Sequence, residues 1–137
     1  MRCESVLLIA CISVASAFLQ QSVGVRGRLV CGDQPLSGAT LKLINEKFGP
    51  NNQLAATKTD VFGNYVLSGG IGQIFGLDIK MKIYTSCNKA VMLCDREITL
   101  GIPGNFVTRT DRVVNWFNGG VLNMQFKFKD EETSCLH

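Results

Sequence analysis

The sequence predicts an all-β protein, a sandwich of two antiparallel β-sheets with seven or eight strands. Apolar and polar residues alternate with a period of two along most of the chain, most clearly over Leu77–Cys87. Turn-forming residues separate the alternating segments at short intervals, and no segment after the N-terminus has a convincing helical apolar period. Strands with one apolar face must bury it against a second layer, which favours a two-sheet sandwich.

The first 17 residues have the form of a secretory signal peptide. Arg2 precedes an apolar run from Val6 to Val14, and Ala15-Ser16-Ala17 supplies the small residues of a cleavage site. We therefore expect residues 1–17 to be removed and residues 18–137 to form one extracellular domain of ordinary size. No later apolar run approaches the length that spans a bilayer.

The expected strands follow one another along residues 18–137. They are Val25–Cys31, Ala39–Ile44, Leu54–Thr59, Asn64–Leu67, Leu77–Cys87, Cys94–Ile102, Val113–Phe117 and Leu122–Lys129. Asn118-Gly119-Gly120 predicts a hairpin turn between the last two strands, because Asn and Gly tolerate positive φ. Alternation predicts that one of Trp116 and Phe117 faces solvent.

Four cysteines remain after the expected cleavage, namely Cys31, Cys87, Cys94 and Cys135. An even count in a short secreted chain indicates two disulfides. A zinc site fits less well, because the chain has no CxxC pair and a single histidine at its C-terminus. The short spacing favours a local Cys87–Cys94 pair, which leaves Cys31 with Cys135; the other two connectivities stay open.

Composition and motifs argue against several functional classes. The net charge of +3, from 14 basic and 11 acidic residues, and the absence of a basic block argue against nucleic-acid binding. A catalytic nucleophile would need a base, and the body of the domain contains no histidine. Asp95 and Glu97 fit a solvated strand face, and residues 130–132 fit an exposed tail. We expect no enzyme activity, cofactor or metal.

Four segments carry a family resemblance: VRGRLVCGDQPLSGATLKL, KTDVFGNYVLSG, IYTSCN and CDREITLGIP. Together they resemble the nematode transthyretin-like family over nearly all of residues 18–137. The resemblance implies a secreted prealbumin-type sandwich. Its wider superfamily includes thyroid-hormone carriers and 5-hydroxyisourate hydrolases. The hydrolases use several histidines and end in Tyr-Arg-Gly-Ser, whereas this chain ends in Glu-Thr-Ser-Cys-Leu-His.

Outward basic residues suggest a binding surface. If the first and last strands share a sheet, as in transthyretin, Arg26, Arg28, Lys127 and Lys129 would share one face. Such a face could meet anionic lipid headgroups or acidic glycans. The plainer interpretation is that these are solvated strands whose charges prevent edge aggregation.

The sequence therefore favours a secreted, non-catalytic binding or bridging protein. The partner classes considered are a lipid, a hydrophobic small molecule and a cell-surface protein. The alternatives are a hydroxyisourate-hydrolase-like enzyme, which lacks its motif residues here, and a host-interaction or structural protein without a small-molecule ligand. The sequence specifies neither the ligand nor the oligomeric state.

Overall fold

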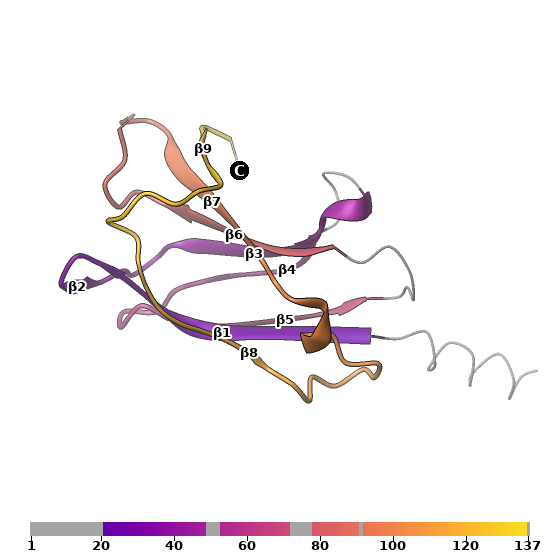
Figure 1. Cartoon of the computed structure of the whole chain (residues 1–137). Coiled ribbons are helices and arrows are strands. Elements are labelled where there is room, and N and C mark those ends of the chain that lie inside the picture. The colour runs from indigo at the N-terminus through magenta and orange to yellow at the C-terminus, as the bar shows by residue number, and fades with distance from the viewer. Residues whose placement is uncertain (1–20, 49–52, 72–77, 91, 137) are drawn as a thin grey trace, which may run out of the picture.

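The computed structural model describes residues 21–48, 53–71, 78–90 and 92–136, which form two β-sheets packed face to face (Figure 1). Sheet A contains β1 (Gln21–Cys31), β2 (Gln34–Pro35), β5 (Asn64–Ile71) and β8 (Phe117–Asn123). Sheet B contains β4 (Gln53–Lys58), β3 (Thr40–Asn45), β6 (Ile79–Thr85), β7 (Asp95–Gly101) and β9 (Glu131–Ser134), in that order. Two short 3₁₀ helices, η1 (Glu46–Phe48) and η2 (Gly104–Phe106), lie in connections. The predicted β-sandwich is confirmed, with nine strands among the described residues.

The core lies between the sheets and consists of alternate strand residues. Val25 and Leu29 of β1 are fully buried against Leu41 and Leu43 of β3, with β6 and β7 completing the layer. Burial of one Leu, Ile or Val side chain stabilises the fold by about 1.5–3 kcal/mol relative to its exposure. This alternation is therefore the main local reason for the strand register.

Strand β1 is the centre of sheet A. It pairs antiparallel with β5, from Gln21↔Ile71 to Arg28↔Asn64, and parallel with β8. The remaining pairs of both sheets are antiparallel. Sheet A therefore places β8 at an edge, directly beside β1.

The predicted hairpin at Asn118–Gly120 is wrong, as is the strand Val113–Phe117 apart from Phe117. The three residues lie inside β8. A Cβ on Gly119 would lie 2.4 Å from the hydroxyl oxygen of Tyr65, so a glycine is required for the Tyr65 ring to pass beneath β8. Gly120 has φ 67° where the β1–β8 register shifts, which is a bulge and not a turn between two strands.

The predicted strand Leu122–Lys129 is also wrong beyond its first two residues. β8 ends at Asn123, whose side-chain oxygen accepts hydrogen bonds from the amides of Gly32 and Gln125. These bonds turn the chain out of sheet A and across to sheet B, where β9 pairs with β7. Phe126 is consequently exposed, whereas alternation along a strand Leu122–Lys129 would put it on the same face as Leu122 and Met124.

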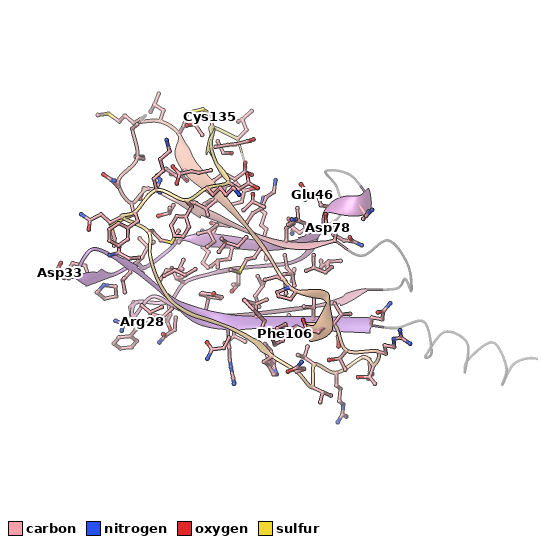
Figure 2. All side chains as sticks on the ribbon, in the orientation of Figure 1. Arg28, Asp33, Glu46, Asp78, Phe106 and Cys135 are labelled. Carbon is pink, nitrogen blue, oxygen red and sulfur yellow. A yellow bond between two sulfur atoms is a disulfide. The ribbon has the colours of Figure 1, made fainter. Side chains whose placement is uncertain are left out.

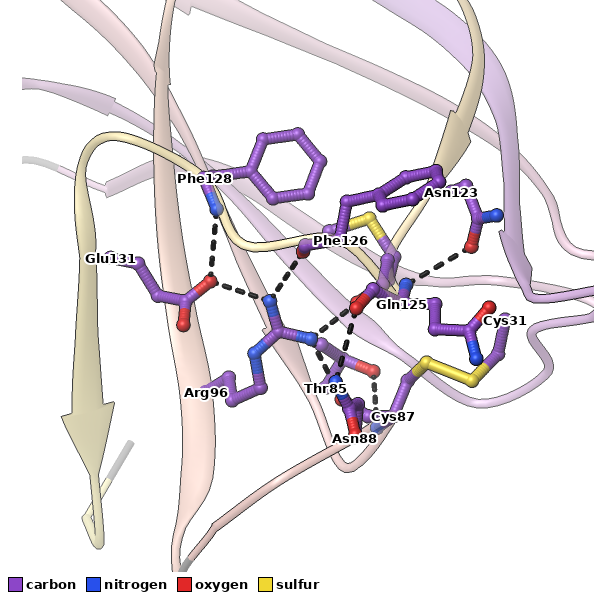
Figure 3. A network of polar contacts seen from close by, with 11 residues as sticks. Cys31, Thr85, Cys87, Asn88, Arg96, Asn123, Gln125, Phe126, Phe128 and Glu131 are labelled. Carbon is purple, nitrogen blue, oxygen red and sulfur yellow. Dashed lines mark hydrogen bonds and ion pairs between the residues drawn. A yellow bond between two sulfur atoms is a disulfide. The ribbon is translucent and has the colours of Figure 1, made fainter.

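Two disulfides are present, as predicted, but their expected connectivity is wrong. The structure joins Cys31 to Cys87 and Cys94 to Cys135. The first ties the end of β1 in sheet A to the residues that follow β6 in sheet B (Figure 3). The second disulfide depends on the pairing of β9 with β7. Asp95 lies opposite Ser134 in this antiparallel pair, so the adjacent residues Cys94 and Cys135 also lie opposite each other.

Candidate binding face

The candidate site lies on the outer face of sheet A, where β1 presents Arg26 and Arg28. Both side chains are exposed, whereas Val25 and Leu29, which point to the opposite face of the strand, are buried. Figure 2 shows Arg28 on β1, near the turn that precedes β5. Alternation thus predicted the outward position of both arginines.

Only part of this outer face is open. The first half of β1 is covered by the segment 103–116, which bonds to it through two hydrogen bonds of 2.8 Å between Ser22 and Thr108. A Cβ on Gly24 would lie 2.6 Å from the Trp116 ring, so the indole packs directly on that glycine. Trp116 and Phe117 are both half-buried, and the prediction that one faces solvent is wrong. Phe117 stacks edge-on against Phe106 at 5.0 Å.

The open half contains a shallow depression of about 460 Å³. In register, Arg26 lies between Val66 of β5 and Asn118 of β8, and Arg28 lies between Asn64 and Val121. All six line the depression, together with Gly27, Tyr65 and Gly120. Val66 and Val121 are each 63% exposed. The face therefore combines two guanidinium groups, two amides and two apolar side chains.

The turn before β5 adds a rigid apolar projection to this face. The Asp60 carboxylate accepts hydrogen bonds of 2.9 Å from the amides of Phe62 and Asn64. Gly63 has φ 81°, a conformation that favours glycine. The Phe62 ring is 64% exposed, and its carbonyl accepts a 2.9 Å hydrogen bond from Arg28 Nε. Sequence reasoning missed this projection, although the apolar Val61-Phe62 pair inside a turn was a visible signal.

The two arginines have no acidic partner in the part of the chain that the structure describes. Among the described residues, none of the ion pairs involves Arg26 or Arg28. The Phe62 carbonyl is the acceptor that the described part of the chain provides for Arg28. Their charges are therefore available to an external anion.

The structure does not bring all four predicted basic residues together. Lys127 and Lys129 are exposed, but they follow the end of β8, in the segment that crosses to sheet B. They are not among the residues that line the depression. Of the four predicted basic residues, only Arg26 and Arg28 therefore lie together on the outer face of sheet A.

A second polar centre, around Arg96 of β7, was not recognised in the sequence (Figure 3). Arg96 is 7% exposed. Its Nη1 donates to the carbonyls of Cys87 (2.8 Å) and Met124, and its Nη2 donates to the Phe126 carbonyl (2.9 Å) and the Glu131 carboxylate (2.5 Å). The bond from Arg96 holds the pKa of Glu131 below its ordinary value. Glu131 is therefore not an exposed tail residue, and Arg96 fastens the crossover segment to sheet B.

The other predicted acidic residues lie on sheet B. Glu97 accepts a 2.7 Å hydrogen bond from the Tyr84 hydroxyl and pairs with Lys82 Nζ at 3.4 Å. Burial and the Glu97 carboxylate together raise the pKa of Tyr84. Lys42 lies over the Tyr84 ring, 5.1 Å from its centroid. These contacts balance charge within sheet B.

An exposed apolar group lies at the Cys94–Cys135 bridge. Met92, Leu93 and Leu136 are 84%, 91% and 94% exposed, and each lies within two residues of that disulfide.

Across the described ranges no cluster of three or more His, Cys, Asp or Glu side chains could hold a metal ion. No helix within those ranges has the length and apolarity needed to cross a bilayer.

Comparisons with known proteins place the chain in a family. Residues 26–103 match the model of the transthyretin-like family, a range that includes the second half of β1, the turn at Asp60 and β7. Transthyretin-like protein 33 of Caenorhabditis elegans is 37% identical over 98% of this chain and 96% of its own length. Transthyretin-like protein 5 of the same nematode is 31% identical over 96% of this chain and 98% of its own length.

Among solved structures, a 9R-lipoxygenase from Cyanothece shares 15% identity over 77% of this chain and 17% of its own, with a TM-score of 0.43. That similarity is too low to bear on function. The match of residues 26–103 and the two full-length relatives are decisive, and the chain belongs to the transthyretin-like family.

Proposed function

We propose that this protein acts outside the cell as a non-catalytic binding protein, and that it recognises an anionic partner through Arg26 and Arg28. The observation that supports this most directly is the pair of exposed guanidinium groups on neighbouring outward positions of β1, for which the described residues supply no acidic partner. Guanidinium groups bind carboxylate, phosphate and sulfate oxygens through paired hydrogen bonds.

The surroundings of the arginines suit such a role. Residues two apart on a strand lie on the same face, roughly 7 Å apart, so one anionic group can contact both side chains. Asn64 and Asn118 add amide donors, and Val66 and Val121 add apolar contact area. The hydrogen bond from Arg28 to the Phe62 carbonyl holds that side chain in place, which reduces the entropy lost on binding.

Secretion is part of this proposal. We expect residues 1–17 to act as a signal peptide, and we expect both disulfides to form in the oxidising environment that a secreted chain meets. Mass spectrometry of the protein collected from culture medium would test this. A mature chain that retains residues 1–17 or carries four free thiols would contradict it.

Binding is tested with three anionic carriers, namely phosphatidylserine vesicles, heparin and poly-L-glutamate. The double variant Arg26→Glu/Arg28→Glu should lose at least about tenfold in affinity for the carrier that the wild type binds, because each charged hydrogen bond contributes about 1.5–3 kcal/mol.

The matched control is Lys127→Glu/Lys129→Glu, which changes the net charge by the same amount outside the depression. It should change affinity by less than about twofold at physiological salt. Equal losses in the two double variants would show that only net charge matters. Binding to none of the carriers would also contradict the proposal.

A further inference from the structure

Strand β8 offers an unusual sheet edge. Among the described residues it pairs only with β1, and its sequence, FNGGVLN, contains neither a charged residue nor a proline. Natural sheets normally protect such edges with lysines, prolines or a covering segment. In the described part of the chain the protection is limited to the bulge at Gly120, and Asn118, Gly120 and Val121 are exposed.

Backbone groups of β8 point to this open edge. The Val30 carbonyl accepts a hydrogen bond from the Met124 amide, and Val30 lies opposite Asn123 in the ladder. Because successive residues of a strand direct their N–H and C=O groups to opposite sides, Val121 and Asn123 direct their N–H groups away from β1. Within the described residues, neither N–H donates a hydrogen bond.

Strand β5, on the other side of β1, packs its inner face closely on β4 of sheet B, because a Cβ on Gly69 would lie 3.0 Å from the Leu54 carbonyl oxygen. Among the described residues the outer edge of β8 is unpaired, and an additional strand could join sheet A there.

We propose that the outer edge of β8 accepts an extended, acidic segment of another protein as an added strand. Only a polypeptide supplies the alternating N–H and C=O groups that a strand edge lacks, and this favours a protein over a lipid or a glycan. Acidic side chains are required because the adjoining strand carries Arg26 opposite Asn118 and Arg28 opposite Val121. A second copy of this chain would place four arginines and no acidic side chain on one continuous face, which disfavours it as the occupant.

The geometry permits contact between the added strand and the arginines. Strands are spaced about 4.8 Å apart, so the added strand lies roughly 10 Å from β1. Asn118 and Gly120 are small, and an Arg26 side chain can extend across them toward a Glu side chain reaching from the other direction. This inference rests on the proposed function, because it names the partner of the same arginine face.

The test uses the full mature protein and two ten-residue peptides, one alternating Glu and Val and one alternating Lys and Val. At about ten times the dissociation constant of the Glu-Val peptide, hydrogen exchange at Val121 and Asn123 should slow about tenfold. The Lys-Val peptide should leave these amides unchanged. Arg26→Glu should abolish the protection, and Lys127→Glu should retain it.

Val121→Pro removes an N–H that the fold does not use, so it should abolish peptide binding, and Val121→Thr should retain it. The exchange map of the wild type decides the question even if the proline variant does not fold. Unchanged exchange along β8, together with Arg26-dependent binding to vesicles or heparin, would overturn this inference and leave the proposed function standing. Protection that rises with protein concentration alone would show that a second copy occupies the edge, which also overturns it.

Discussion

Arg96 and the pair Arg26/Arg28 all lie on strands, yet their surroundings differ completely. Arg96 is buried in sheet B, and four acceptors of its own chain surround its guanidinium group. Arg26 and Arg28 are exposed on sheet A, where the described residues offer them one carbonyl and no carboxylate. The difference separates an arginine that organises the fold from arginines that remain available to a partner.

The cost of desolvating a charge explains this division. A buried guanidinium is tolerated only when its donors are satisfied, and removal of one partner then leaves an unpaired group in a medium of low dielectric constant. An exposed guanidinium loses little in water and retains its donors for an external anion. Stability measurements should therefore respond to Arg96, and binding measurements to Arg26 and Arg28.

The largest expected effect is on Arg96. Arg96→Ala should lower the free energy of unfolding by about 3–5 kcal/mol, because Glu131 and three carbonyls lose their common donor. Arg26→Ala should change it by less than about 0.5 kcal/mol. Urea unfolding of both variants measures the difference. Similar losses for the two would contradict the division between a structural and an available arginine.

A smaller effect is expected at the two buried tyrosines. The Tyr65 hydroxyl has no hydrogen-bond partner among the described residues, whereas the Tyr84 hydroxyl donates to Glu97. Tyr65→Phe should therefore raise the free energy of unfolding by about 1 kcal/mol, and Tyr84→Phe should lower it by a similar amount. Thermal unfolding of the two variants tests this, and a loss of stability in Tyr65→Phe would show that its hydroxyl has a partner.

Alkaline pH provides a related test. Burial raises the pKa of Tyr65 from 10.0 to about 12, so the unfolded chain releases this proton first. The corresponding stability is present below pH 10 and is lost as the pH rises toward 12. Tyr65→Phe should lose less stability than the wild type over this window, as measured by urea unfolding at fixed pH values. Parallel curves would contradict the assignment.

The smallest expected effect is the acid dependence of the Arg96 network. The Arg96 bond lowers the pKa of Glu131, so its stabilising contribution is present above the ordinary carboxyl pKa and is lost as the pH falls below it. Glu131→Gln should flatten this part of the acid unfolding curve. Glu132→Gln, an exposed neighbour on the same strand, is the control and should leave the curve unchanged.

Alternation in the sequence predicted six strands, from β1 to β7 without the short β2, because each has one mainly apolar face. It also predicted the outward positions of Arg26 and Arg28. It misjudged β8 because Asn118-Gly119-Gly120 resembles a hairpin turn, whereas Gly119 leaves room for the Tyr65 ring of β5 and Gly120 takes the positive φ of a bulge. Close approaches of this kind depend on tertiary packing and leave no local signal.

The disulfide connectivity could not be predicted for a related reason. β9 is an edge strand with the polar sequence EETS, so no alternation of apolar and polar residues predicts it. Its pairing with β7 determines the position of Cys135, and Arg96 and Glu131 determine the path of the chain toward it. The same path removes Lys127 and Lys129 from the β1 face, which local periodicity could not reveal.

The claim that Arg26 and Arg28 bind one anionic group is tested most directly by NMR of the arginine side-chain Nε–H signals, with tetraglutamate as the added anion. The signals of Arg26 and Arg28 should shift together with one dissociation constant, and the Arg96 signal should stay in place. Arg109 and Arg112, which are exposed elsewhere, serve as internal controls. Shifts at Arg109 and Arg112 without shifts at Arg26 and Arg28 would contradict the account.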